Sequence, residues 1–264
     1  MHENNTRKLG QFIWFGYQIP IPERVKLIKQ AGFETVLHWW DDSFVEKDGF
    51  SKEEQVDIIR AGGLFIENAH LPYESINDIW LDTRKGQELL DLYLSDIDGL
   101  ADYEIPVAVF HLTRGLEPPP ATDIGMNRIH RLIEKAENRG VKIAVENVTK
   151  NQNLEVVLST FDSPMLGFCY DSGHDYAWSE TPYTILDKYK DRLFAVHLHD
   201  NMGEKDEHSA LGEGMIDWSI VRNGIERSAY NGSYTLESDK VVSALQTPFE
   251  YLKIHYESAC KYLL

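Results

Sequence analysis

Short apolar runs and longer amphipathic stretches alternate eight times along this chain, and that alternation limits its fold more than any other feature. The apolar runs predict strands, and the stretches with a period near 3.6 residues predict helices. Strands are expected at residues 11–16, 35–40, 64–71, 107–112, 141–148, 166–171, 194–199 and 233–237. Helices are expected at residues 22–30, 52–60, 83–103, 121–138, 154–161, 183–190, 218–230 and 248–263.

The expected strands are mostly continuous apolar runs, which is typical of parallel strands buried on both faces. Eight strand–helix units in 264 residues predict an α/β fold, a single (β/α)8 TIM barrel. Because no Pro/Gly/Ser-rich linker interrupts the alternation, residues 1–264 are expected to form one domain. A doubly wound open sheet is the alternative, but no glycine-rich phosphate loop follows the first strand.

The composition limits the kinds of molecule that this protein is expected to bind and the environment in which it is expected to occur. The chain carries 26 Lys and Arg against 43 Asp and Glu, a net charge of −17, which disfavours binding to a nucleic-acid backbone. Two cysteines, Cys169 and Cys260, are too few for a disulfide framework. The first residues lack the apolar segment of a signal peptide, and no run approaches the ~18 apolar residues of a membrane span. We expect a cytoplasmic protein without a membrane segment; the oligomeric state, a homo-oligomer included, stays open.

Four ionisable residues stand at the ends of four expected strands, where a barrel of this kind builds its active site. They are Glu146, Asp171, His197 and Glu237. A carboxylate that follows an apolar run is costly to bury unless it is paired or bound to a metal, so a structural salt bridge is the alternative. Three oxygens and one nitrogen predict a site for a divalent metal ion: Mn²⁺, Zn²⁺, Co²⁺ or Mg²⁺.

A second group of ionisable residues is richer in imidazole and favours zinc. Its members are His70, His111, His174, Asp206 and His208, which we assign to substrate binding or to an additional metal. Asp206 and His208 are two residues apart on a loop, a spacing that can clasp an ion. His199 is expected to share a strand face with His197, and only one of the two need be a ligand.

Several segments resemble the xylose-isomerase-like TIM-barrel superfamily: AVENV, YDSGH, VHLHDN, DEHSALGEGMIDW and LES. That superfamily includes sugar-phosphate isomerases and epimerases, inosose dehydratases, ketose 3-epimerases and the apurinic endonuclease IV family. The resemblance implies that Glu146, Asp171, His197 and Glu237 hold one divalent metal ion. It also implies that the two glutamates exchange protons with the substrate and that His174 contacts substrate oxygens.

The chain is also similar to endonuclease IV, which binds three zinc ions through nine ligands. Matching residue types stand at His70, His111, Glu146, Asp171, His174, His197, Asp206, His208 and Glu237, and Tyr73 matches a further motif. Two features depart from that family: residues 38–42 (HWWDD) are aromatic and acidic where a nuclease presents basic side chains, and the net charge is −17. The ketose 3-epimerases carry an arginine where this chain has residues 201–203 (NMG).

These observations favour a metal-dependent isomerase or epimerase of a sugar, sugar phosphate or cyclic polyol. The metal would polarise a carbonyl, and one of Glu146 and Glu237 would remove a proton from the neighbouring carbon to give a metal-bound enediolate. The other glutamate would return a proton. The alternative is an endonuclease IV-like trinuclear zinc phosphodiesterase. A barrel that only binds a sugar gains little from two glutamates on one metal.

Other aromatic and histidine residues have simpler expected roles. Trp14, Phe15, Trp39 and Trp40 cluster near the first two strand ends, where an aromatic face can stack on a sugar ring. Core packing is expected for at least half of these four. His38 stands at a strand end as well. His2, His130 and His255 are expected to be solvated, because they fall on the N-terminal segment or on expected helices.

Overall fold

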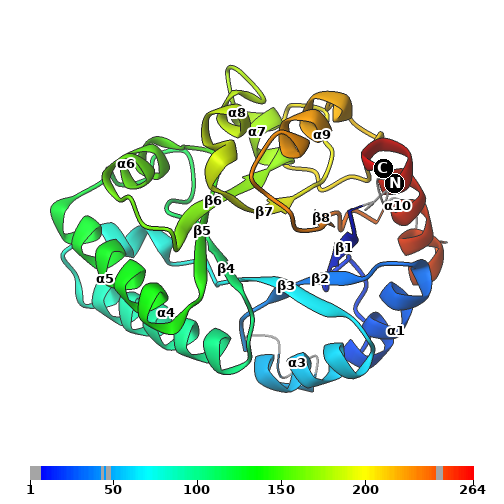
Figure 1. The fold of residues 1–264 in the computed structure, drawn as a ribbon, viewed down its shortest axis with the longest axis horizontal. Coiled ribbons are helices and arrows are strands. Elements are labelled where there is room, and N and C mark those ends of the chain that lie inside the picture. The colour runs from blue at the N-terminus through cyan, green and yellow to red at the C-terminus, as the bar shows by residue number, and fades with distance from the viewer. Residues whose placement is uncertain (1–6, 43–44, 46–48, 242–245) are drawn as a thin grey trace, which may run out of the picture.

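The computed structural model describes residues 7–42, 45, 49–241 and 246–264, and it confirms the TIM barrel (Figure 1). All paired strands are parallel, in the order β7-β6-β5-β4-β3-β2-β1-β8. The two edge strands meet through Leu198, whose N–H donates to the Thr235 carbonyl at 2.9 Å. The Leu198 carbonyl in turn accepts from the Glu237 N–H at 3.0 Å, so the sheet curls into a barrel.

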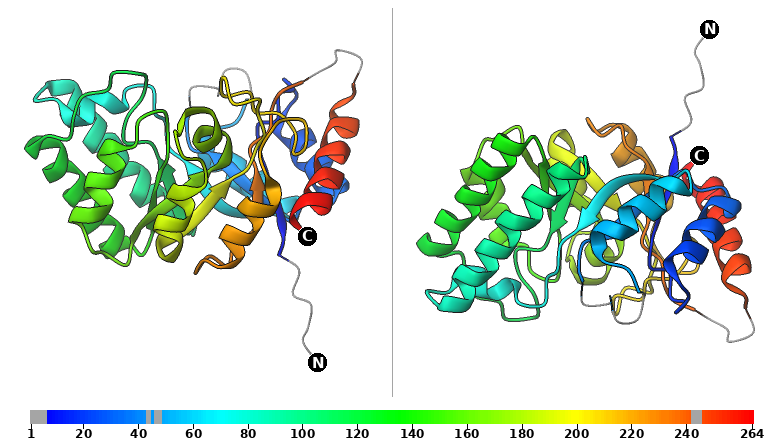
Figure 2. Two further views of the ribbon diagram at one scale, coloured as in Figure 1. Left: turned by 90° about the horizontal axis from the view of Figure 1, so that it is seen from above. Right: turned by 90° about the horizontal axis from the view of Figure 1, so that it is seen from below.

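The strands are β1 (Leu9–Phe12), β2 (Thr35–Trp39), β3 (Phe65–His70), β4 (Val107–Phe110), β5 (Lys142–Glu146), β6 (Leu166–Asp171), β7 (Leu193–His197) and β8 (Tyr234–Leu236). The helices after them include α1 (Ile21–Ala31), α3 (Lys52–Ala61), α4 (Arg84–Asp102), α5 (Asp123–Arg139), α6 (Gln152–Thr160), α8 (Thr184–Tyr189), α9 (Trp218–Glu226) and α10 (Pro248–Leu263). These helices surround the strands, and α10 packs beside α1 to complete the ring (Figures 1 and 2).

All eight expected strands are present; β6 has the expected bounds, and the bounds of the other seven differ. The largest shift is at the first strand, which spans Leu9–Phe12 instead of residues 11–16. The chain turns at Gly16 (φ +87°), where a Cβ would lie 2.2 Å from the Asp239 carbonyl oxygen. Among the described residues, three short helices were not expected: η1 (Ile76–Trp80), α7 (Ser172–Trp178) and η2 (Lys190–Arg192). Helix α7 begins directly after Asp171, which accepts the backbone N–H of His174 at 2.6 Å.

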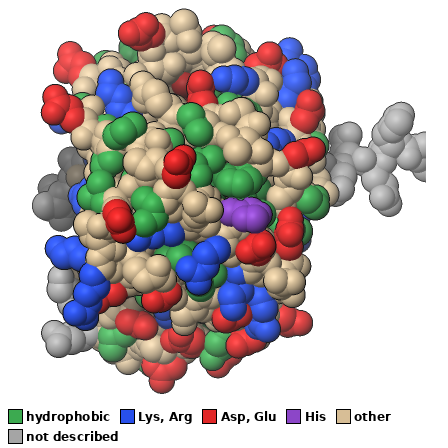
Figure 3. Space-filling model, turned by 90° about the vertical axis from the view of Figure 1, so that its left-hand side faces the viewer, with side chains coloured by type: hydrophobic (Ala, Val, Ile, Leu, Met, Phe, Trp, Pro, Cys, Tyr) green, Lys and Arg blue, Asp and Glu red, His purple; other side chains and the backbone are tan. Residues whose placement is uncertain are grey.

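The helical face that carries α4 and α5 mixes charges of both signs (Figure 3). Lys135 and Arg139 on α5 pair with Asp98 on α4, at 2.7 and 3.1 Å. Among the described residues, no helix combines the length and apolar character that crossing a membrane requires.

The expectation that His255 is solvated was wrong. His130 is exposed on α5 as expected, and His2 lies outside the described residues. His255, by contrast, is 3% exposed on the inner side of α10, with its ring 3.9 Å from the ring of Tyr251. Burial lowers the pKa of His255 to about 3, because a charged imidazole would lose its hydration there.

This burial predicts a pH effect on stability. The folded state keeps His255 neutral, whereas the same residue in the unfolded chain binds a proton near pH 6.5. The contribution of His255 to the free energy of unfolding is therefore fully present above pH 6.5 and is lost as the pH falls toward 3. Between pH 7.5 and 5.0 this one group should remove about 2 kcal/mol from the free energy of unfolding. His255→Phe should reduce the loss by that amount in urea titrations. His130→Phe, on the exposed face of α5, is the control; an equal loss in His255→Phe and the wild type would contradict the prediction.

Candidate active site

Four strand ends converge at one end of the barrel. Ligand atoms of Glu146, Asp171, His197 and Glu237 all lie within 4.8 Å of one another. Three of these residues end β5, β6 and β7, and Glu237 follows β8 directly. The set that the sequence analysis singled out therefore comes together in space, and its role as a metal site stays a prediction.

The inner atoms of this set face one another without hydrogen bonds. The Nδ1 atom of His197 lies 3.1 Å from Glu146 Oε2 and 2.9 Å from Glu237 Oε2. None of these three buried atoms has a hydrogen-bond partner among the described residues. Buried polar atoms are rarely left in this way, since each forfeits its hydration without compensation. Ligand atoms that converge on a shared point fit a divalent cation.

Four histidines of the site are anchored from outside by one ring nitrogen. The contacts are His197 Nε2 with Asn68 Oδ1 (3.3 Å), His70 Nδ1 with the Leu71 carbonyl (2.7 Å), His174 Nδ1 with the Asn147 carbonyl (2.9 Å) and His208 Nδ1 with the Glu237 carbonyl (2.7 Å). A ring N–H that donates to such an oxygen directs the other ring nitrogen into the site. Metal-binding histidines are typically held by this kind of outer hydrogen bond.

The imidazole-rich group divides into two clusters. His70 and His111, from β3 and the residue after β4, lie beside Glu146, with Nε2–carboxylate distances of 3.3 and 3.5 Å. The other members follow β6 and β7, and His174 links the two clusters, since its Nδ1 also lies 3.2 Å from Glu146 Oε1.

The second cluster contains His174, Asp206 and His208. Asp206 Oδ2 lies 3.3 Å from His174 Nε2 and 2.9 Å from His208 Nε2. His199 joins this cluster, since its Nε2 lies 3.1 Å from the Asp171 carboxylate and its ring stacks on that of His208 at 4.0 Å. Gly173 leaves room for the His199 ring, because a Cβ there would lie 1.8 Å from it.

Two asparagines at the site, Asn147 and Asn68, were not identified from the sequence. The side chain of Asn147 exchanges two hydrogen bonds with the backbone of Asp171, both of 2.8 Å, and so ties the end of β6 to the end of β5. Asn68 lies fully buried on β3, where it contacts His197. Its position two residues before His70, on the same alternating face of a strand, was the available signal.

Neighbouring histidines lower the pKa values of the two glutamates, Glu146 and Glu237. Burial alone would raise the pKa of Glu146, but His197 and His111 outweigh it and hold this pKa well below its usual range. Burial also opposes ionisation of Glu237, yet His197 lowers its pKa to about 2. Both side chains are therefore carboxylates at neutral pH, the form that binds a cation.

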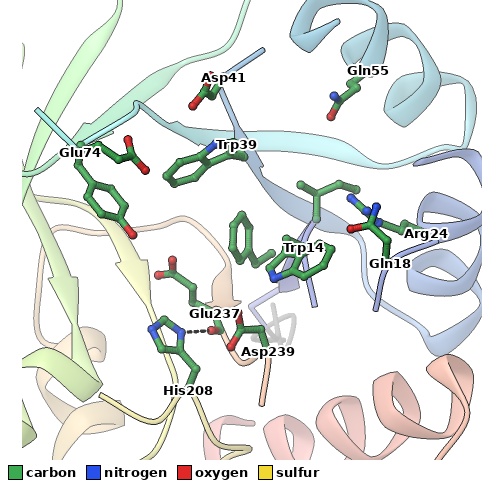
Figure 4. A pocket seen from close by; sticks show the side chains of 13 residues that line it. Trp14, Gln18, Arg24, Trp39, Asp41, Gln55, Glu74, His208, Glu237 and Asp239 are labelled. Atoms are coloured by element: carbon green, nitrogen blue, oxygen red, sulfur yellow. Dashed lines mark hydrogen bonds between the residues drawn. The ribbon is translucent and has the colours of Figure 1, made fainter. Parts of the chain in front are cut away.

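A cavity of about 370 Å³ opens beside Glu237 (Figure 4). Trp14 and Trp39 line it, and Trp39 also stacks on His70 at 5.2 Å. Phe15 and Trp40 are instead buried in the core. His38 is remote from both clusters, because its Nε2 contacts the Lys52 carbonyl at 3.1 Å on the helical side of β2.

The contact between Asn68 and His197 predicts a change in metal affinity. Asn68→Leu removes the acceptor that orients His197 and should weaken binding of Mn²⁺ or Zn²⁺ about 10–100-fold in a chelator competition. Asn68→Asp keeps an acceptor oxygen and should recover most of that affinity. Circular dichroism checks the fold of both variants. Unchanged affinity in a folded Asn68→Leu variant would contradict the orienting role.

Known proteins are similar to this chain in sequence or in fold. A Bacillus thuringiensis inosose dehydratase is 26% identical over 290 aligned positions, which cover 95% of each chain. A Sinorhizobium fredii protein is 33% identical over 124 residues, but the match covers only 44% of this chain and 40% of that protein. A crystal structure of the IolI protein with a bound zinc atom superposes with a TM-score of 0.80 at 15% identity, covering 97% of this chain and 98% of that one.

A structure of D-allulose 3-epimerase from Methylomonas in complex with D-allulose gives a TM-score of 0.75 at 16% identity, covering 97% of this chain and 96% of that one. At these identities the two structures establish a shared fold. The family model described as xylose isomerase-like TIM barrel matches residues 25–254. This chain belongs to the xylose isomerase-like TIM barrel family.

Proposed function

We propose that this protein is a divalent-metal-dependent isomerase or epimerase of a sugar, sugar phosphate or cyclic polyol. The observation that carries the proposal is the convergence of Glu146, Asp171, His197 and Glu237, with unbonded inner atoms, beside an aromatic-lined cavity. The family includes enzymes such as inosose dehydratase, and a relative in fold holds zinc, which supports a metal-using enzyme.

These four residues would hold the ion, and a bound divalent ion supplies a Lewis acid that polarises a substrate carbonyl. Glu237 lines the cavity, so we assign it removal of the proton from the carbon next to that carbonyl. Glu146 faces the same centre from β5, and we assign it the return of a proton. Return to the same carbon from the opposite side gives an epimer, and return to the neighbouring carbon gives an isomer.

The two glutamates can be tested separately. Glu146→Gln and Glu237→Gln should each retain the fold and lose about 100-fold or more of the turnover number, because an amide cannot accept the substrate proton. The assay uses manganese-loaded protein and a panel of ketoses, ketose phosphates and inososes. Glu134→Gln, on the exposed side of α5, is the matched control. More than about a tenth of the wild-type rate in either active-site variant would move proton transfer to another group.

A three-metal phosphodiesterase is the second candidate, and one observation favours it. The described residues offer four groups that could each hold an ion, at three places: one around His70 and His111, two that overlap around His197, and one around His208. Glu146 belongs to every group except the one around His208. In such a site a metal supplies a hydroxide nucleophile. The net charge of −17 opposes it, since a duplex would have to approach against the field of the protein.

The metal content distinguishes the two candidates. We expect purified protein loaded with zinc and dialysed to retain a first tightly bound ion, and we expect Asp206→Ala/His208→Ala to keep both this ion and ketose turnover. If the protein is a nuclease, it should bind close to three zinc ions, the double variant should lose zinc, and wild type should cleave a duplex with one abasic site at low salt. Efficient cleavage there would replace the isomerase proposal with the nuclease.

A further inference from the structure

The segment after β7 forms a loop that returns to its own start. The backbones of Asp200 and Ser209 exchange two hydrogen bonds of 2.9 Å, in which each N–H donates to the carbonyl of the other residue. Asp206 and His208 lie between these two residues in the sequence. The position of both side chains therefore depends on how firmly the loop is held at Asp200.

The side chain of Asp200 is fully buried at the base of this loop. Its Oδ1 atom accepts the backbone N–H groups of Asn201 at 3.0 Å and Ile216 at 3.2 Å. Its Oδ2 atom accepts the backbone N–H of Gly212 at 2.8 Å and the indole N–H of Trp218, the first residue of α9, at 2.9 Å. Hydrogen bonds to a carboxylate are stronger than those to a neutral acceptor. One buried carboxylate thus joins the start of the loop, its return and the next helix.

Two glycines allow the backbone to approach this carboxylate. Gly212 adopts a φ of +87°, a left-handed conformation that favours glycine, and its N–H is directed at Asp200. A Cβ at Gly214 would lie 2.3 Å from Asp200 Oδ1 and 2.3 Å from the Asn201 carbonyl oxygen. The LGEG run at residues 211–214 therefore fits around Asp200, which explains a sequence motif that the chemistry of the four strand-end residues does not require.

His208 is held in one orientation within this loop. Its φ is +48°, and a non-glycine residue keeps such a conformation where the surrounding contacts determine it. The His208 carbonyl accepts the N–H groups of Asp239 at 3.1 Å and Lys240 at 3.2 Å. Its ring stacks on that of His199, and the residue lines the cavity. A shift of the loop would therefore move this imidazole relative to the cavity.

We propose that Asp200 is a positioning residue for the candidate active site. Its carboxylate fixes the loop of residues 201–216, and the loop in turn directs Asp206 toward His174 and places His208 in the wall of the cavity. In Asp200→Asn, an amide group replaces one carboxylate oxygen, and its N–H donors would face two of the N–H groups that the carboxylate accepts. The effect on substrate binding rests on the proposed function, whereas the placement of His208 does not.

The placement of His208 can be tested without metal or substrate. Proton–carbon correlation signals of the histidine rings are recorded for the metal-free full chain, and His208→Ala assigns the signal of that residue. Asp200→Asn should shift the His208 signal, because the ring would leave its stacked position on His199. The signal of His130, on the exposed face of α5, should stay. If Asp200→Asn does not fold, Trp218→Phe takes its place: it removes one of the four donors, keeps an aromatic ring and should shift the same signal by a smaller amount.

Glu67→Gln is the matched control. Glu67 is also a buried carboxylate, which accepts hydrogen bonds from the Ser233 N–H at 2.6 Å and from the hydroxyl groups of Tyr230 and Thr235, both at 3.2 Å. It lies beside the start of β8, away from the candidate active site. This variant should lose stability in the same way but leave the His208 signal unchanged, which separates a positioning role from a general loss of stability.

Kinetics of the manganese-loaded full chain test the step from the loop to the substrate. With the ketose, ketose phosphate or inosose that the wild type turns over, Asp200→Asn should raise KM about tenfold and change kcat by less. Adding Asp200→Asn to Asp206→Ala/His208→Ala should raise KM no further, because Asp200 acts through the loop that carries both residues. Glu67→Gln should leave KM unchanged.

The outcomes separate this inference from the proposed function. An unshifted His208 signal in folded Asp200→Asn, or in Trp218→Phe where it takes its place, overturns the inference, and so does an equal shift in Glu67→Gln. A shifted signal with an unchanged KM also overturns it, as does an additive increase of KM in the triple variant, since Asp200 would then act by another route. A shifted signal in a protein that turns over no member of the panel supports the placement of the loop and contradicts the proposed isomerase.

Discussion

Closure of the barrel between β7 and β8 is the constraint on which the rest of the site depends. The two hydrogen bonds of Leu198, to Thr235 and from Glu237, join strands that the sequence separates by more than a whole helical unit. They bring Glu237 to within 2.9 Å of His197. Without that seam, the fourth carboxylate would lie at an open sheet edge, and the cavity beside it would lose one wall. The backbone hydrogen bonds between β7 and β8 therefore fix the relative positions of the side chains at the candidate active site.

Two kinds of interaction stabilise the polar interior at this end of the barrel: attraction between carboxylates and imidazoles, and hydrogen bonds from the imidazoles to oxygen atoms behind them. Carboxylates buried among apolar strands would ordinarily be protonated or paired. Here imidazoles keep Glu146 and Glu237 ionised, and each anchored imidazole is held by an oxygen behind it. The asparagines at positions 68 and 147 supply part of this support. Such a shell holds the ring orientations that a metal or substrate requires, because rotation would break the outer hydrogen bond.

A cavity with aromatic and acidic residues in its lining adjoins this centre. These residues come from the last positions of strands, such as Trp39 on β2, and from the loops that follow, where barrels of this kind vary their function. The departures noted in the sequence, the acidic and aromatic residues 38–42 and the absence of an arginine at residues 201–203, agree with this environment. Trp39 and Asp41 from the first of these segments line the cavity directly.

The eight strand–helix units, the barrel and the four strand-end residues that converge could be predicted from the sequence, because periodicity and position along a strand are local properties. It could not divide the imidazoles between two clusters, since that depends on which strands become neighbours around the barrel. It also could not separate Trp14 and Trp39 in the cavity from Phe15 and Trp40 in the core, or reveal the burial of His255 under α10. These points depend on packing between elements far apart in the chain, which a local sequence pattern does not specify.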